Sequence, residues 1–156
     1  MTQLFENLWW ITKSVVYEEF LFRGVLLLLS LHYLSPRNAC LLNGFAFGIY
    51  HWFSYGIIGN IQAMIYILIL TGSMGYLLAH AFHRSKGIIA PIGIHMGVNI
   101  STITLFSKGP IGSGVFLLSD PATPLNLTMS LSLSLAFPLF YMVAAFYLIN
   151  KIYSKE

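Results

Sequence analysis

Polar side chains recur at helical spacing in three separate apolar stretches of this sequence. They are Glu18, Glu19 and Arg23 in the first stretch, His51 in the second, and His95 and Asn99 in the third. The apolar Phe47 lies one turn before His51 and is expected to pack under its ring. Residues four apart share one face of an α-helix, so each stretch can present its polar groups to a common centre. Glu19 and Arg23 have this spacing and are expected to form an ion pair. Glu18 is then turned by about 100° around the helix and can point elsewhere.

Side chains of these types can hydrolyse an amide bond when they meet. A carboxylate near a histidine can act as a general base and activate a water molecule. A second histidine and an asparagine amide can donate hydrogen bonds to the oxyanion that develops at the carbonyl. An arginine paired with the second glutamate can hold the first glutamate in place.

A metal-dependent version of the same site is equally compatible with the residue types. Glu18, His51 and His95 could bind a divalent metal such as zinc, which would then activate the water. The sequence leaves both versions open, so the cofactor is either a divalent metal or none. Cys40 is the only cysteine among 156 residues, which excludes an internal disulfide and a cysteine-rich zinc site.

Composition indicates which kind of element positions these residues. Hydrophobic residues make up 57% of the chain and charged residues 8%, whereas soluble domains are about a quarter charged. The mean hydropathy is +0.76. A bilayer is the simplest solvent for such a chain. The net charge of +3 is small, and its basic residues lie at the ends of apolar runs, which indicates membrane topology rather than nucleic-acid binding.

Five apolar stretches approach the roughly 20 residues that cross a bilayer. The predicted spans are about 8–33, 39–53, 61–82, 87–106 and 127–149. We therefore expect an all-α fold, a polytopic transmembrane helical bundle of about five spans, as a single domain over 1–156. The glycine- and proline-rich segment 107–126 is expected to be a loop. The N-terminal residues lack the basic region of a signal peptide, so none is expected.

Basic residues predict the orientation of a multi-pass membrane protein. Five fall on one side of the predicted spans and two toward the other. The first group is Arg37, Arg84, Lys86, Lys151 and Lys155, and the second is Lys13 and Lys108. This bias places the C-terminus in the cytoplasm. Measured from that side at about 1.5 Å per residue, Glu18 and His51 lie about 20–24 Å deep and His95 about 12 Å, so one polar layer is feasible.

The three motifs, in this order on successive apolar helices, resemble the CAAX-protease and bacteriocin-processing family, also called the Abi family. The flanking residues match as well, with Glu-Glu-Phe-Leu-Phe-Arg-Gly in the first motif and Phe-Gly-Ile-Tyr-His in the second. The resemblance covers about 15–101, which we take as the protease-like core. It implies an intramembrane endopeptidase on an all-helical fold.

The resemblance also implies a role for each residue. Glu18 corresponds to the carboxylate that activates water and His51 to its partner. His95 and Asn99 correspond to the pair that stabilises the oxyanion, and Glu19 with Arg23 to a supporting ion pair. The implied substrate is a peptide or prenylated protein in the membrane. Members are commonly described as metalloproteases, although a metal-free, glutamate-driven mechanism is also argued for the family.

Two other functions are compatible with the same residues. The chain could be a non-enzymatic immunity or scaffold protein, of the bacteriocin self-immunity type, in which the polar layer serves structure. It could also be a small transporter with a proton-linked Glu/His site. Proteolysis lost on Glu18→Ala would distinguish the enzyme from both, and substrate flux in liposomes would identify the transporter. The substrate and the oligomeric state do not follow from the sequence.

Overall fold

The computed structural model describes residues 2–105 and 127–154, and every regular element within them is helical. Along the chain these elements are α1 (Thr2–Glu19), the π-helix η1 (Phe20–Leu27), α2 (Leu28–Tyr33), α3 (Pro36–Ser54), α4 (Ile61–Ser85), α5 (Ile89–Asn99), the π-helix η2 (Ile100–Leu105) and α6 (Leu127–Ile152). The all-α prediction is confirmed. The helical stretches fall within a few residues of the five predicted spans, except that the first already begins at Thr2. The predicted loop at 107–126 lies outside the described residues.

Local sequence signals set the ends of the helices. Helix α3 has Pro36 in its first turn, where the missing N–H of proline costs no hydrogen bond. Asn60 caps α4, since its side-chain oxygen accepts from the Ala63 backbone N–H at 3.2 Å. Lys86 ends α4 with a left-handed backbone, at φ 55°.

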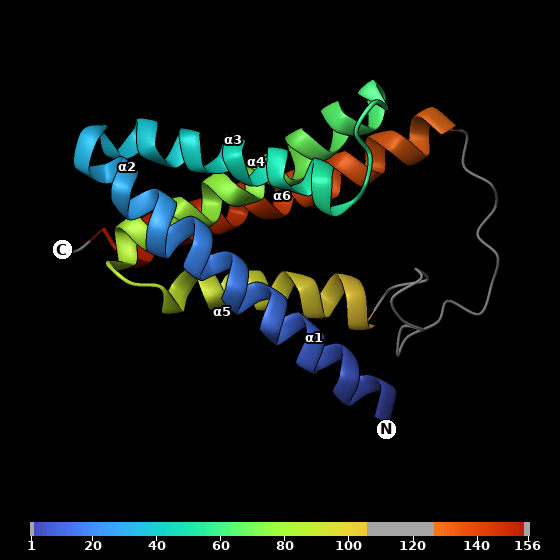
Figure 1. Ribbon diagram of the computed structural model, residues 1–156, viewed down its shortest axis with the longest axis horizontal. Helices are drawn as coiled ribbons and strands as arrows, with labels where there is room; N and C mark the ends of the chain where they lie inside the picture. Colours follow the sequence, from blue (N-terminus) through green and yellow to red (C-terminus); the bar gives the residue numbers. More distant parts are fainter. Residues whose placement is uncertain (1, 106–126, 155–156) are drawn as a thin grey trace.

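Two π-helical segments adjoin the residues that the sequence singles out. The π-helix η1 begins directly after Glu19 and contains Arg23, and it joins α1 to α2 as one continuous rod (Figure 1). The π-helix η2 begins directly after Asn99. Such segments are rare and often lie at functional sites, because the wider turn redirects side chains and frees backbone groups.

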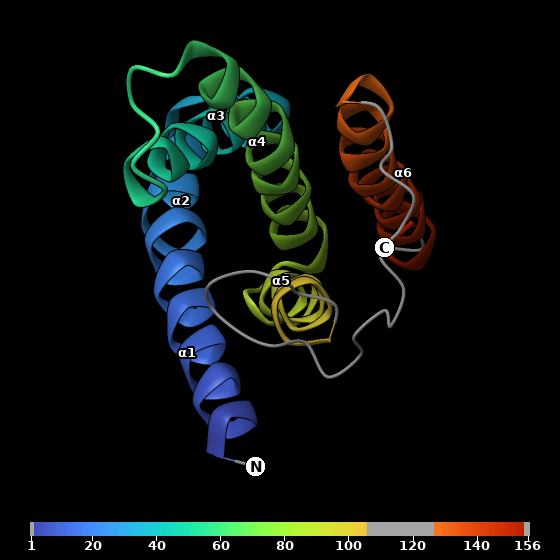
Figure 2. The same cartoon turned by 90° about the vertical axis from the view of Figure 1, so that its right-hand side faces the viewer.

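Helix α4 lies in the middle of the bundle and contacts α3, α5 and α6 (Figures 1 and 2). Its contact with α3 depends on small residues. A Cβ added to Gly44 would lie 2.7 Å from the Gly72 carbonyl oxygen, and one added to Gly75 would lie 2.7 Å from the Phe47 Cβ. Close approach through glycines is typical of helix pairs in membranes. On the other side of the bundle, α1 packs against α5.

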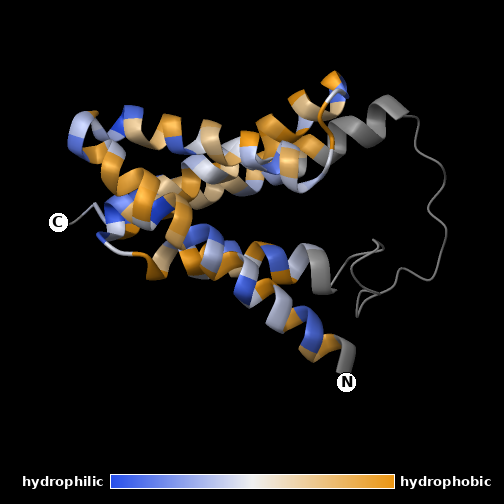
Figure 3. Cartoon of the chain, viewed as in Figure 1, coloured by the Kyte–Doolittle hydropathy of each residue, from blue (hydrophilic) through white to orange (hydrophobic). Residues whose placement is uncertain are grey.

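Helix α4 is the one described helix that is both long and apolar enough to cross a bilayer, with a mean hydropathy of 1.7 over its best window. The described part of α6 from Pro138 to Ile152 is apolar but shorter. The rod of α1, η1 and α2 is divided by its π segment and carries Glu18, Glu19 and Arg23. Hydrophilic positions interrupt the apolar stretches of the ribbon where α1 lies beside α5 (Figure 3).

Candidate active site

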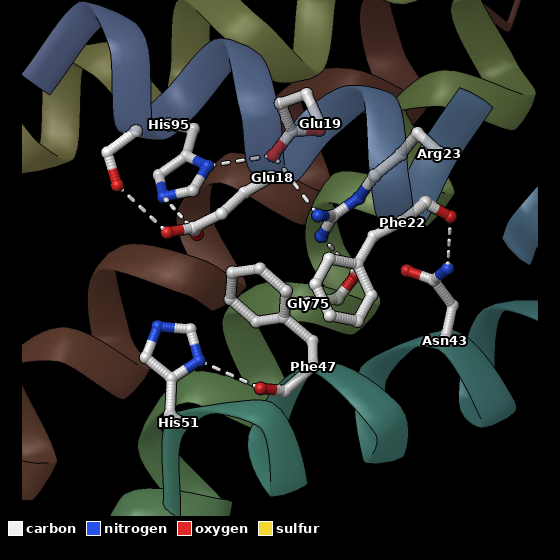
Figure 4. Close-up of polar contacts among 10 residues, drawn as sticks. Glu18, Glu19, Phe22, Arg23, Asn43, Phe47, His51, Gly75 and His95 are labelled. Carbon is white, nitrogen blue, oxygen red and sulfur yellow. Dashed lines mark hydrogen bonds and ion pairs between the residues drawn. The ribbon is translucent and has the colours of Figure 1, made fainter. Parts of the chain in front are cut away.

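The Glu19 carboxylate is the centre of a buried polar cluster between α1, η1 and α5. Its Oε1 accepts hydrogen bonds from Arg23 Nη1 at 3.1 Å and from His95 Nδ1 at 2.7 Å (Figure 4). Arg23 Nη2 donates to the Gly75 carbonyl oxygen of α4 at 3.0 Å. Glu19 and Arg23 are both 0% exposed. The predicted ion pair of Glu19 with Arg23 is confirmed. Through His95 and the Gly75 carbonyl it also connects the rod of α1, η1 and α2 to α5 and α4.

Glu18 lies beside this cluster and faces a different way around the helix, as its position in the sequence predicts. Its Oε1 accepts a hydrogen bond from the Ser14 hydroxyl at 3.0 Å, and its Oε2 lies 3.8 Å from His95 Nε2. The described residues offer no hydrogen-bond partner to Oε2. Oε1 is therefore fixed by a hydrogen bond and Oε2 is buried without one, while the residue as a whole keeps 8% of its surface exposed.

His51 enters the layer from α3, on the far side of the Phe47 ring from Arg23. Its Nδ1 lies 2.8 Å from the Phe47 carbonyl oxygen, so that nitrogen must carry the proton. In the neutral ring Nε2 is then an acceptor, and Figure 4 shows it turned toward Glu18. The Phe47 ring packs under His51 at 4.6 Å between centroids, and the Arg23 guanidinium lies 4.7 Å from the same ring. No hydrogen bond joins His51 to Glu18 among the described residues.

His95 carries a constrained tautomer as well. Its Nδ1 contacts the Glu19 carboxylate, which only accepts when ionised, so Nδ1 donates. Its Nε2 faces Glu18. Both histidines thus bind their supports through Nδ1 and present Nε2 to the same carboxylate. This arrangement orients two rings around Glu18, although His95, not His51, is the histidine nearest to it.

Asn99 lies one turn after His95 at the last position of α5 and is half-buried. The part of the chain that the structure describes provides no hydrogen-bond partner for its side chain. The structure therefore gathers Glu18, Glu19, Arg23 and His95 in direct contact, holds His51 across from them, and leaves Asn99 at the edge of the layer.

Three supporting contacts were missed by the sequence reasoning. These are the Ser14 hydroxyl on Glu18, the Gly75 carbonyl on Arg23, and the amide of Asn43, which donates from Nδ2 to the Phe22 carbonyl oxygen at 2.6 Å. The Phe22 carbonyl lies within η1, where it accepts this additional bond. Ser14 is four residues before Glu18, so helical spacing could have found it. The other two depend on how the helices pack.

The donor atoms have the chemistry that zinc prefers, since zinc binds carboxylate oxygens and neutral imidazoles whose other nitrogen is held by a carboxylate or carbonyl. Glu18, His51 and His95 satisfy that pattern by type and tautomer. Their separations do not fit, because residues 2–105 and 127–154 contain no group of three such side chains close enough to hold one ion.

The fold and the cluster define an all-helical protein in which the Glu18 carboxylate lies beside two oriented imidazoles and next to the buried ion pair of Glu19 with Arg23. Residues 2–101 match the family model of the Rce1-like type II CAAX prenyl endopeptidases. The match covers more than half of the chain, so the chain belongs to this family of membrane-embedded, CAAX-type proteases. No curated protein and no solved structure matches the chain.

Proposed function

We propose that this protein is an intramembrane endopeptidase in which Glu18 activates the attacking water. The observation that carries the proposal is the asymmetry of the two neighbouring glutamates. Glu19 is 0% exposed and is held by the Arg23 guanidinium and the His95 ring, whereas Glu18 keeps 8% of its surface exposed and, among the described residues, accepts a hydrogen bond only from the neutral Ser14 hydroxyl, with its Oε2 3.8 Å from His95 Nε2. A general base needs this combination of a fixed position and a free lone pair.

The reaction follows from the donors and acceptors around Glu18. The Glu18 carboxylate takes a proton from water while the water oxygen bonds to the scissile carbonyl carbon. The Nε2 of neutral His51 accepts the second hydrogen of that water and so orients it. When the tetrahedral intermediate collapses, the C–N bond breaks and Glu18 returns its proton to the leaving nitrogen.

The oxyanion formed in the first step requires hydrogen-bond donors. The His95 ring donates from Nδ1 to Glu19, and its Nε2 becomes a donor to the oxyanion when that nitrogen carries a second proton. The Asn99 amide supplies a second donor once a substrate lies in the site. Glu19 and Arg23 hold the His95 ring and the helix that carries Glu18. No step of this mechanism passes through a metal.

The substrate class follows from the family, a peptide or prenylated protein that reaches the site from the bilayer. The membrane placement we propose has five spans and a cytoplasmic C-terminus, on the basis of the basic residues at one end of the bundle. Reporter fusions after residues 35, 58 and 86 test it. The expected result is a reporter active in the cytoplasm at 35 and 86 and outside at 58, and the opposite pattern would overturn the orientation.

The decisive experiment measures cleavage of a panel of quenched fluorescent peptides, farnesylated CAAX peptides included, by the purified full chain in detergent and in lipid. Wild type is compared with Glu18→Gln, and Glu6→Gln is the matched control, because Glu6 is an exposed glutamate on the same helix. We expect Glu18→Gln to lose about 10²–10⁴-fold in kcat/KM and Glu6→Gln to keep the wild-type value.

A strong chelator added to each reaction tests the cofactor. Unchanged cleavage supports the metal-free mechanism, and a loss restored by zinc supports a metal-dependent one. Full activity in Glu18→Gln would overturn the assignment of the base.

A second candidate function, a non-enzymatic immunity or scaffold protein, is favoured by the contacts of Glu19 with Arg23 and His95 and of Arg23 with Gly75, which would hold the helices together without any reaction. Protection of cells against a bacteriocin that survives Glu18→Gln would support that function.

A further inference from the structure

Helix α3 begins at the end of the bundle where α4 and α6 end (Figure 1). A basic pocket lies there, lined by residues of α3 and α4. Its volume is about 320 Å³ and its lining includes Arg37, His80, His83 and Arg84. None of the described residues that line it is acidic. The pocket is separate from the Glu18 cluster, because the polar lining groups lie on the last turns of α4 and the first turn of α3.

Donors in this pocket remain available for an anion. Arg84 Nη2 donates to the Tyr153 carbonyl oxygen at 3.1 Å, and this contact holds the side chain against α6. Its buried Nε has no hydrogen-bond partner among the described residues. A buried N–H without a partner is uncommon in folded proteins and indicates a missing acceptor. Arg37 is exposed at the mouth and forms no ion pair within the described part of the chain.

His80 has a different role in the same pocket. Its Nε2 lies 3.0 Å from Asn150 Oδ1, and the Asn150 amide nitrogen in turn donates to the Phe146 carbonyl oxygen. His80 Nε2 therefore donates to Asn150 and fixes α6 to α4. The cations that face an incoming anion are Arg37 and Arg84, together with His83 when it is protonated.

An apolar groove of about 540 Å³ lies between α3, α4 and α6, next to the basic pocket. Its walls include Leu41, Leu68, Met142 and Val143. Tyr76 lines both the groove and the pocket, so the two spaces are neighbours at this residue. Arg84 lies 16 residues after Leu68 on the same helix, which is about 24 Å at 1.5 Å per residue. That length exceeds half of a hydrocarbon core about 30 Å thick.

We propose that these two spaces form one binding site for an anionic phospholipid, with the phosphate between Arg37 and Arg84 and an acyl chain along the groove. Charge complementarity selects the headgroup, and the position of the apolar groove beside the basic pocket, with Tyr76 lining both, selects a ligand that is anionic at one end and apolar along the rest. Basic pockets between membrane helices bind anionic headgroups of the cytoplasmic leaflet. The proposal depends on the membrane placement given above and is independent of the peptidase chemistry.

Native mass spectrometry of the full chain in detergent tests the site with three probes, namely phosphatidylglycerol, phosphatidylcholine of the same acyl chains, and inorganic phosphate. We expect one phosphatidylglycerol to be retained per chain and neither other probe to match its affinity. Equal retention of phosphatidylcholine would show that the site does not select for the negative charge of the headgroup. Equal binding of inorganic phosphate would show an anion site without an acyl-chain groove. Either result overturns the proposal.

Two variants test the two halves of the site. Arg37→Gln is expected to weaken phosphatidylglycerol binding about tenfold, while Lys13→Gln, an exposed lysine toward the other end of the bundle, leaves it unchanged. Val143→Trp places a ring in the groove from the exposed face of α6 and is expected to weaken binding by a similar factor. Equal effects of Arg37→Gln and Lys13→Gln would show that binding depends only on nonspecific charge. Full affinity in Val143→Trp would show that the acyl chain does not bind in the groove.

Discussion

Helices α3 and α4 approach each other through glycines, whereas α1 and α5 are joined through ionisable side chains. At the first contact, a single added Cβ on Gly75 would lie 2.7 Å from the Phe47 Cβ. At the second, Glu19 accepts from Arg23 and from His95 with no exposed surface of its own. Added side-chain volume is therefore expected to destabilise the glycine contact, and loss of one charge of the ion pair is expected to destabilise the polar contact.

The two contacts have different roles, since the α3–α4 contact supports the fold and the α1–α5 contact holds the groups that surround Glu18. The α3–α4 contact contributes shape, and it also places the Gly75 carbonyl oxygen where Arg23 Nη2 reaches it at 3.0 Å. The α1–α5 contact contributes oriented donors and acceptors around Glu18. Substitutions at the two contacts should consequently affect different observables, stability at the first and both stability and rate at the second.

The largest effect on stability is expected from Arg23→Met. Removing the guanidinium leaves the buried Glu19 carboxylate with His95 alone, and breaking a buried ion pair in this way costs about 3–5 kcal/mol. Unfolding in a denaturing-detergent series measures the loss, with Arg37→Met in lipid-free detergent as the exposed control. Adding Glu19→Gln to Arg23→Met should recover part of the loss. No recovery would mean that the charge pair does not stabilise the contact.

Asn99→Ala should change the rate and leave stability unchanged. The side chain has no hydrogen bond in the described structure, so its removal costs little folding energy, but loss of an oxyanion donor lowers kcat by about 10²–10³-fold. Single-turnover cleavage and an unfolding curve on the same preparation measure both. A wild-type kcat in this variant would show that Asn99 does not act as an oxyanion donor.

Gly75→Ala should destabilise the glycine contact by about 1–3 kcal/mol, because the added methyl group overlaps Phe47. The matched control is Gly93→Ala on α5, where an added Cβ meets nothing within 4 Å. There the greater helix propensity of alanine should stabilise the protein by about 0.5–1 kcal/mol. Opposite signs for the two variants are the expected result, and equal signs would contradict the close approach at Gly75.

The smallest effect is expected from Ser14→Ala. It removes the hydroxyl that holds Glu18 Oε1 at 3.0 Å, a neutral contact to a charged acceptor, and should lower kcat/KM by about tenfold. Ser30→Ala is the control, because the Ser30 hydroxyl donates to the Leu26 carbonyl oxygen within its own helix and touches no site residue. A change in kcat/KM of the same size in both variants would show that Ser14 does not position Glu18.

Local spacing predicted the parts of the site that lie within one helix. The ion pair of Glu19 with Arg23 and the packing of Phe47 under His51 both connect residues four apart, and both are present. The helical stretches were also predictable, since apolar runs and turn residues mark their limits. These features need no knowledge of how one helix is rotated against another.

Contacts between helices could not be predicted in the same way. Spacing grouped His95 with Asn99, and the family resemblance implied His51 as the partner of Glu18, but the structure places His95 between the two glutamates at 2.7 Å and 3.8 Å. The rotation of α5 against α1 decides this, and the π-helices that influence it have no signature in the apolar pattern. Which of these contacts operate in the reaction stays a prediction for the variants above.

The ion-pair network also constrains how the protein is made. Helix α1 with η1 leaves the ribosome carrying Glu18, Glu19 and Arg23, while two partners of that cluster lie 52 and 76 residues later in the chain, at Gly75 and His95. A lone charge at the centre of an inserting helix costs about 2.5–3.5 kcal/mol. With the five-span placement proposed above, integration of this segment should therefore be incomplete until α4 and α5 have been synthesised. Biogenesis of the bundle would then be a late, collective event rather than a series of independent insertions.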